Sequence, residues 1–230
     1  MDHAGGSLDR AESHLAVASR LDPTNRSIQH TRANLARRQS LLAQNFSSRK
    51  QLRDLARSRL TGLTGSAANF PYGYHTAAQI ALDELRDVLT EAKLKTADGV
   101  LDREIIDLTR DVEKHLNDGL QKFPINEHLL TLESEYRQVM EQDARAEGAL
   151  KKAFAANPRL DWIAARLSRV LLARGDVEGA KSVLRKCVDE NPSSKRAHFA
   201  LKDQQGSRGL SKAFGASMER GTTKQVQPGQ

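Results

Sequence analysis

Apolar residues recur at helical spacing along most of this chain, and proline, glycine or asparagine stands at the interruptions. In residues 75–95, for example, Ala78, Leu82, Leu85 and Leu89 follow one another at intervals that place them on one helical stripe. Runs of β-branched and aromatic residues, which favour strands, are sparse. The pattern therefore predicts an all-α protein, with helices over residues 8–25, 27–46, 49–60, 75–95, 101–123 and 195–204, and two more in each of 127–160 and 161–194.

Three prolines punctuate these helices at a constant interval, since Pro124, Pro158 and Pro192 are separated by 34 residues and again by 34. The residues twelve, eight and five positions before them follow a pattern of small, large and small side chains: Ala146, Leu150 and Ala153; Ala180, Leu184 and Cys187; and, more loosely, Val112, Leu116 and Gly119. Small residues let two helices approach closely, and the large residue fills the space between them. The spacing predicts stacked pairs of antiparallel helices.

A period of 34 residues with these side chains before each proline resembles the tetratricopeptide repeat (TPR) superfamily. The resemblance is strongest over residues 127–160 and 161–194, and it implies a TPR-like α-solenoid with an irregular helical middle. Ala11, Leu15 and Ala18 stand at the same three distances before Pro23. We therefore expect the following organisation: a half repeat and basic helices over 1–60, a loop at 61–74, a TPR-like helical array over 75–205 and a flexible tail at 206–230.

The half repeat before Pro23 lacks the residues for its own first helix, so we expect the chain to be the C-terminal part of a longer protein. Uncovered faces of terminal repeats would favour self-association. The runs NRSIQHTRANLARRQ and FPYGYHTAAQIALDELRDVL, followed by regular repeats, resemble the C-terminal region of large bacterial multidomain proteins that carry a STAND-type NTPase or a SIR2-like effector. That resemblance implies a sensor or oligomerisation arm separated from those parts.

The TPR resemblance also implies a function, namely a protein–protein interaction scaffold that binds a peptide or a protein on its concave face. The first helix of each pair lines that face, which gives these expected partner-binding residues: His128, Thr131, Glu135, Gln138, Trp162, Arg166 and Arg169. Trp162 and Arg169 are the strongest candidates, because Trp and Arg dominate interface energetics. The alternatives are a packing role for Trp162 and a solvated surface position for Arg169. A chaperone-type carboxylate clamp is not expected, because Thr131 and Glu135 stand where lysine and asparagine would be needed.

The charge of +7 is unevenly distributed along the chain. Residues 26–59 contain nine Lys/Arg and one acid, Asp54, whereas residues 83–147 contain seventeen acids and nine bases. One hypothesis is a nucleic-acid-binding surface, for which the candidates are Arg37, Arg38, Arg49, Lys50, Arg53 and Arg57. The alternative, which we favour, is that the basic helices pack against the acidic middle of the same chain or of a neighbour.

The motifs of catalysis and of cofactor binding are absent from the sequence. There is no glycine-rich phosphate loop, and the histidines lie far apart without metal-binding spacing. Cys187, the single cysteine, stands at a position that needs a small residue, so we expect it to be buried. No apolar stretch approaches the roughly 20 residues of a membrane-spanning helix. We therefore expect a cytoplasmic, non-enzymatic protein without a metal, a cofactor or a membrane partner.

Overall fold

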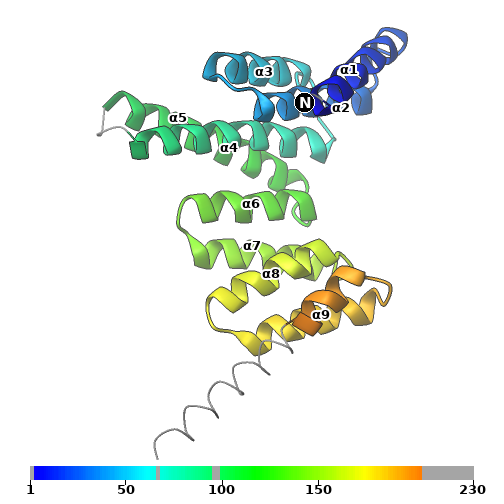
Figure 1. Ribbon diagram of the computed structural model, residues 1–230, viewed down its shortest axis with the longest axis vertical. Helices are drawn as coiled ribbons and strands as arrows, with labels where there is room; N and C mark the ends of the chain where they lie inside the picture. Colours follow the sequence, from blue (N-terminus) through cyan, green and yellow to red (C-terminus); the bar gives the residue numbers. More distant parts are fainter. Residues whose placement is uncertain (1–2, 66–67, 95–98, 204–230) are drawn as a thin grey trace, which may run out of the picture. The chain divides into compact units, whose positions relative to one another are not determined.

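The computed structural model describes residues 3–65, 68–94 and 99–203, and the regular elements in these ranges are all helical (Figure 1). Their bounds are α1 His3–Leu21, α2 Arg26–Leu42, α3 Phe46–Arg59, α4 Pro71–Leu94, α5 Gly99–Lys122, α6 Glu127–Val139, α7 Asp143–Ala156, α8 Asp161–Ala173 and α9 Val177–Glu190. Residues 195–203 are also helical. The prediction of an all-α protein is confirmed, whereas the tail predicted at 206–230 lies outside the described residues.

Side-chain caps explain where several of these helices begin. The side chains of Asn25, Asn126 and Asp176 accept hydrogen bonds from backbone N–H groups three residues later, at 3.2, 3.0 and 2.8 Å. Each bond satisfies one of the donors that a helix N-terminus leaves unpaired. Gly175 precedes the cap of α9 and adopts a φ of 80°, a left-handed conformation that glycine tolerates.

Several predicted boundaries in the N-terminal half were wrong. The first helix spans His3–Leu21 rather than residues 8–25. The helix predicted to run on through Phe46 ends at Leu42, because Ala43 is extended and the Asn45 side chain caps a new helix by accepting from Ser48 N at 2.7 Å. The loop predicted to reach residue 74 ends earlier, because α4 begins at Pro71. Proline suits the first position of a helix, where its missing N–H costs no hydrogen bond.

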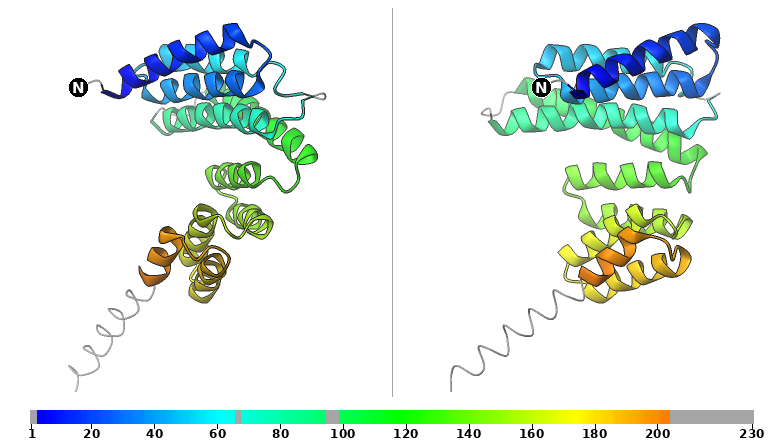
Figure 2. Two further views of the ribbon diagram at one scale, coloured as in Figure 1. Left: turned by 90° about the vertical axis from the view of Figure 1, so that its right-hand side faces the viewer. Right: turned by 45° about the vertical axis from the view of Figure 1, so that its right-hand side comes forward.

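Contacts divide the chain into two compact units, Met1–Ala149 (unit 1) and Leu150–Gln230 (unit 2), with the boundary inside α7. In unit 1, α1 pairs with α2, α2 with α3, and α4 with α5, while α4 also contacts α2 and α6 (Figure 2). The basic segment and the acidic segment therefore lie in one unit. In unit 2, α8 pairs with α9.

The small and large positions predicted from the proline spacing are buried. Ala146, Leu150 and Ala153 of α7 are at most 2% exposed, and the equivalent residues of α9, including Cys187, are 0% exposed. In α5 the third position is Gly119, where an added Cβ would lie 2.9 Å from the Cβ of Tyr74. Ala11, Leu15 and Ala18 of α1 are only half-buried, since α1 packs mainly against α2.

Candidate partner-binding face

Three helices of unit 1 lie in a row, with α4 in contact with α2 on one side and α6 on the other. Side chains from all three meet in two clusters. We name these the aromatic cluster (His30, Phe70, Tyr72, His75 and His128) and the ionic cluster (Arg37, Asp83, Arg86 and Glu135). Both clusters include residues of α6 that the sequence predicts to face a partner.

The aromatic cluster joins α2, the residue before α4, α4 itself and α6 through ring contacts. The His30 ring lies 5.5 Å from Phe70 and 5.8 Å from Tyr72, measured between ring centroids, and Phe70 lies 5.7 Å from Tyr72. His128 lies 5.7 Å from Tyr72 and 5.8 Å from His75. Tyr72 is 43% exposed, and the other four are half-buried. Rings that are partly exposed and held by their neighbours offer apolar area at little entropic cost.

Burial keeps two of the histidines uncharged near neutral pH. It lowers the pKa of His75 to about 3, and the nearby charges of His128, Arg37 and His30 act in the same direction. Burial also lowers the pKa of His30, whose Nε2 lies 2.9 Å from Thr76 Oγ1. At these two positions the cluster therefore presents neutral imidazole rings that can form hydrogen bonds, rather than positively charged ones.

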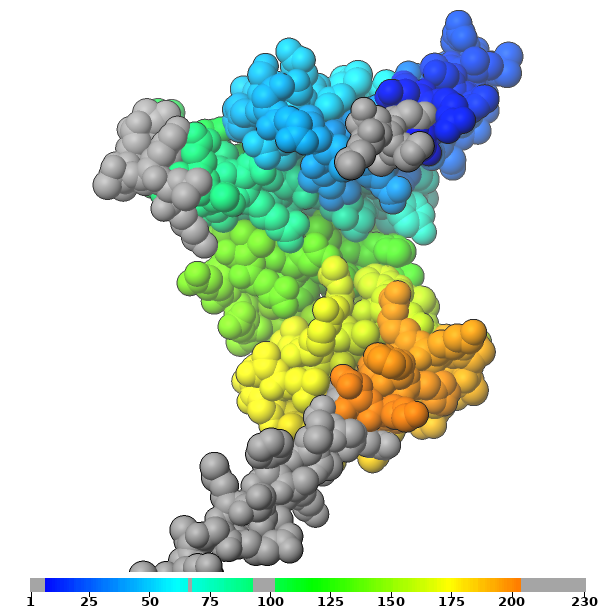
Figure 3. Space-filling view, in the orientation of Figure 1, coloured from blue at the N-terminus to red at the C-terminus, as the bar shows by residue number. Residues whose placement is uncertain are grey.

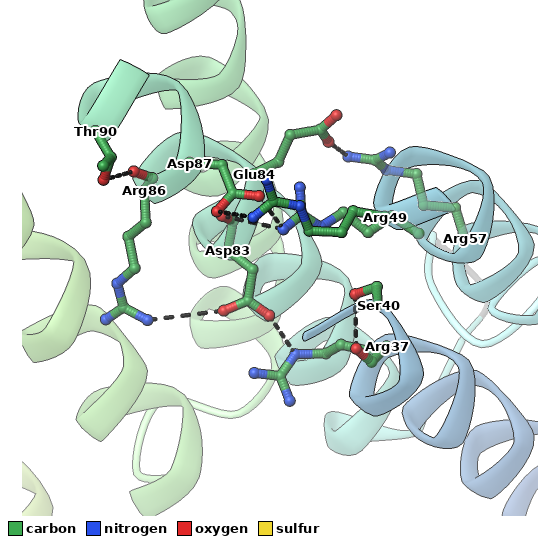
Figure 4. Close-up of polar contacts among 10 residues, drawn as sticks. Arg37, Ser40, Arg49, Arg57, Asp83, Glu84, Arg86, Asp87 and Thr90 are labelled. Carbon is green, nitrogen blue, oxygen red and sulfur yellow. Dashed lines mark hydrogen bonds and ion pairs between the residues drawn. The ribbon is translucent and has the colours of Figure 1, made fainter. Parts of the chain in front are cut away.

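The ionic cluster ties the same three helices together, and its contacts between α2 and α4 are drawn in Figure 4. Arg37 Nε of α2 lies 2.8 Å from Asp83 Oδ2 of α4. Arg86 reaches Asp83 at 3.7 Å and Glu135 of α6 at 3.5 Å. Asp83 is only 7% exposed, and burial raises its pKa, although Arg37 opposes that shift. These pairs fix the side chains on the α4 surface and leave little charge for a partner.

A second set of ion pairs engages most of the arginines that the sequence proposes for nucleic acid. Arg53 is 1% exposed and lies 2.6 Å from Asp87, which also pairs with Arg49 at 3.2 Å. Arg57 pairs with Asp54 at 3.1 Å and with Glu84. Together with Arg37, four of the six candidates are therefore engaged in ion pairs. Their acidic partners lie on α4 (Figure 4), except for Asp54 on α3. These contacts match the alternative in which the basic helices pack against the acidic middle of the chain. Arg38 and Lys50 are exposed.

The four α6 residues predicted to face a partner have different surroundings. His128 belongs to the aromatic cluster and Glu135 to the ionic cluster. Thr131 is 4% exposed and donates its hydroxyl to the Glu127 carbonyl at 2.7 Å, so it packs rather than projects. Gln138 is exposed.

The three residues predicted on α8 belong to unit 2. Trp162 and Arg166 are half-buried, and both make interactions with other groups. Arg169 is exposed and donates from Nε to the Ala165 carbonyl at 3.3 Å.

Two helices contribute residues that sequence reasoning did not select for the partner-binding face, although it proposed Arg37 for nucleic acid. His30 and Arg37 stand 7 and 14 residues after Pro23, as Thr131 and Gln138 do after Pro124, so extending the register to α2 would have found them. Tyr72 and Arg86 of α4 follow no proline at a repeat distance, so the spacing alone could not have identified them. His75 follows Pro71 by four residues, as His128 follows Pro124, but Pro71 lies outside the 34-residue series.

Comparison with known proteins places part of the chain in a family. The family model described as tetratricopeptide repeat matches residues 141–204. This match covers α7, α8 and α9. A search of curated proteins finds no match.

The TPR fold extends beyond these residues. The crystal structure of TTC0263, a thermophilic TPR protein of Thermus thermophilus, is 15% identical, covers 88% of this chain and 93% of its own, and gives a TM-score of 0.62. MamA is 15% identical, with coverage of 73% and 87% and a TM-score of 0.46. The first TPR of Spaghetti (RPAP3), bound to the HSP90 peptide SRMEEVD, is 16% identical, with coverage of 58% and 94% and a TM-score of 0.37. The first comparison shows that the chain has the α-solenoid fold of TPR proteins.

The described part of the chain holds no group of three or more His, Cys, Asp or Glu residues arranged to bind a metal. Among the helices described here, none is both long enough and apolar enough to span a bilayer. Cys187 is buried, and burial raises the pKa of its thiol, which suits the packing role predicted for it.

Proposed function

We propose that this chain is a protein–protein interaction scaffold that binds a segment of a partner protein on the first helices of its repeats. The observation that carries the proposal is the aromatic cluster, in which rings from α2, α4 and α6 meet around the exposed Tyr72. Aromatic anchors supported by packed neighbours are typical of interface hot spots. The proposed contact residues of unit 1 are Tyr72, His128 and Gln138, and those of unit 2, taken by itself, are Trp162, Arg166 and Arg169.

The ionic cluster supports this role by holding the binding surface rigid. Arg37, Asp83 and Arg86 connect α2, α4 and Glu135 of α6 before any partner arrives. A surface that is already ordered loses less conformational entropy when it binds. Thr131 and Glu135 act in the same way, as residues that position the face.

The resemblance to bacterial sensor regions fits the same proposal, since a sensor arm is an interaction scaffold whose partner is a ligand or a neighbouring copy. The nucleic-acid alternative gains less support, because Arg37, Arg49, Arg53 and Arg57 are engaged with acids of unit 1.

The test compares two aromatic residues of nearly equal exposure. Tyr72 is 43% exposed in the aromatic cluster, and Phe46 is 42% exposed at the start of α3. Immobilised full-length chain captures partners from a lysate of its source cells, and the same capture is repeated with Tyr72→Ala, His128→Ala and Phe46→Ala. We expect the first two variants to lose at least about tenfold of the captured partner, as hot-spot residues do, and Phe46→Ala to retain it.

Melting temperatures measured on the same samples separate lost binding from lost folding. The proposal is contradicted by a partner that binds all three variants as well as it binds the native chain. A loss that is equal in the three variants contradicts it as well.

A further inference from the structure

The end of unit 2 carries a second surface, built where the helix at residues 195–203 meets α8. Ser194 donates its hydroxyl to Asp161 Oδ2 at 2.7 Å, and Arg196 lies 3.8 Å from Asp161 Oδ1. Ala197 is completely buried, which fixes the helix against its neighbours. The N-terminal ends of the two helices therefore lie side by side, and their residues form adjoining yellow and orange surfaces in Figure 3.

The repeat register assigns the exposed residues of both helices to one face. Arg196 and Phe199 follow Pro192 by four and seven residues, as Trp162 and Ala165 follow Pro158. Phe199 is 75% exposed and the Arg196 side chain is 60% exposed, although Ala197 between them is buried. We define the unit 2 face as Trp162, Arg166, Arg169, Arg196 and Phe199. Aromatic residues and arginine are the residue types that protein–protein interfaces favour over the rest of the surface.

The helices that carry this face have more positive than negative side chains. Residues 150–203 contain twelve Lys/Arg and six Asp/Glu. Asp161, at the start of α8, is occupied by Ser194 and Arg196, and Asp203, at the far end of the second helix, has interactions of its own. Arg169 makes one local hydrogen bond, to the Ala165 carbonyl. A partner that complements this face must be negatively charged.

We propose that the unit 2 face binds an acidic peptide segment that also carries apolar side chains. Carboxylates of the segment pair with Arg169 and Arg196, and an apolar side chain packs against Trp162 and Phe199. The inference rests on the proposed scaffold function and names the chemistry of the partner at one of its faces. Arginine suits this task because its planar guanidinium pairs with a carboxylate through two parallel hydrogen bonds.

Two other occupants fit the face less well. Residues 204–230 of the chain itself contain four Lys/Arg and one acid, Glu219, so their charge repeats that of the face. A single-stranded nucleic acid requires a continuous track of cations along its backbone. On this face, aromatic residues and the apolar residues Ala165 and Leu172 stand between the arginines. Such an alternation matches a peptide in which acidic and apolar side chains alternate.

The chain provides its own probe for the test, because Trp162 is its only tryptophan. The full-length chain is titrated with a synthetic peptide of alternating glutamate and leucine, blocked at both termini so that only side-chain carboxylates are charged. Matched glutamine–leucine and lysine–leucine peptides serve as comparisons. We expect a saturable change in Trp162 emission with the glutamate peptide alone, and weaker binding as salt is raised.

Charge-reversed variants locate the binding. Arg169→Glu and Arg196→Glu are expected to weaken the glutamate peptide by at least about tenfold, as loss of a charged interface pair does. Arg185→Glu is the matched control, because Arg185 is exposed on α9, outside the face, and the change in charge is the same. Its affinity is expected to stay within about twofold of the native value.

Four results would overturn the proposal: no emission change with the glutamate peptide, equal binding of the glutamine peptide, an equal effect of Arg185→Glu, or a response to oligo-dT in place of the peptide. These failures are distinguishable from failure of the scaffold function. If capture of a partner depends on Tyr72 but not on Arg169, the proposed scaffold function stands and only the proposed acidic peptide is rejected.

Discussion

At the scale of single residues, His75 shows how burial in the aromatic cluster changes the chemistry of a common side chain. It lies among His30, His128 and Arg37, each of which disfavours a further positive charge, and burial does so most strongly. An imidazole in such surroundings stays neutral in the folded protein, whereas it protonates in the unfolded chain. Folding and proton binding are therefore linked at this position.

We predict that the free energy of unfolding falls as the solution is acidified from pH 6.5 toward 3. The His75 pKa is about 3 in the folded protein, against 6.5 for an ordinary histidine. Between these values the unfolded state binds the proton and the folded state does not, so stability present above pH 6.5 is lost as the pH falls. One such group contributes a slope of at most about 1.4 kcal/mol per pH unit. The measurement is urea unfolding followed by circular dichroism at several pH values.

The control for this prediction is a histidine outside the cluster. His75→Gln should flatten the dependence on pH, whatever its effect on absolute stability, because the titrating group is gone. His14→Gln, at an exposed position of α1, should leave the slope unchanged. A slope that is the same in the native chain and in His75→Gln would show that His75 does not carry the linkage.

The arginines of residues 26–59 show what the sequence can and cannot settle at this scale. Their number and the acidic middle of the chain predict that the two segments attract each other. The sequence does not pair Arg53 with Asp87 or Arg37 with Asp83, because those pairings depend on how α2 and α3 lie against α4. Only the geometry separates arginines engaged within unit 1 from Arg38 and Lys50, which are exposed.

At the scale of the helices, boundaries were predictable where a repeat proline marks them. The predicted starts of 127 and 161 coincide with those of α6 and α8. The break after Leu42 was missed because an apolar stripe runs through Leu41, Leu42 and Phe46, all of which are exposed. Asn45 is a capping residue, but hydrophobic periodicity does not register it.

Gly119 and Gly148 provide a matched pair for testing close helix packing. At Gly119 an added Cβ would lie 2.9 Å from Tyr74 Cβ and 3.1 Å from a Leu129 methyl, whereas at Gly148 it would meet nothing within 4 Å. Both lie inside helices, where alanine is favoured over glycine by about 1 kcal/mol. We predict that Gly148→Ala stabilises the protein by roughly that amount.

Gly119→Ala is predicted to destabilise the protein by about 1–3 kcal/mol, because overpacking outweighs the gain in helix propensity. Urea unfolding of the two variants at one pH gives both values. If Gly119→Ala were as stabilising as Gly148→Ala, α5 would have room to move away from Tyr74 and Leu129. The third repeat position of α5 would then not require a small residue.

At the scale of the whole molecule, the sequence predicts the repeat architecture but not its division into two units. The 34-residue spacing continues through Pro124, Pro158 and Pro192 without a change that would mark a boundary inside α7. The spacing selects candidate residues on α6 of unit 1 and, separately, on α8 of unit 2. It does not select Tyr72 and Arg86 of α4, because these residues reach His128 and Glu135 only through the packing of α4 against α6.

The salt dependence of DNA binding tests whether the basic segment acts as a nucleic-acid surface. Six cations in contact with phosphates would give a slope of about −5 in log affinity against log salt concentration, since each contact contributes about −0.9. Four of the six are engaged in ion pairs within unit 1, which leaves Arg38 and Lys50. Two contacts give a slope of about −2 and weak binding.

We therefore predict that fluorescence anisotropy with a labelled DNA duplex, measured between about 50 and 200 mM salt, gives the shallower slope. The double variant Arg38→Glu/Lys50→Glu should remove this segment's contribution, because the other four arginines keep their acidic partners. The prediction is contradicted if the slope is near −5 and stays steep in the double variant. That result would mean that DNA displaces Asp83, Glu84 and Asp87 from their arginines. Those same ion pairs hold α2 and α3 against α4, so DNA binding that breaks them would also lower the melting temperature of unit 1. DNA binding elsewhere on the chain would leave the ion pairs intact, and the melting temperature therefore distinguishes the two cases.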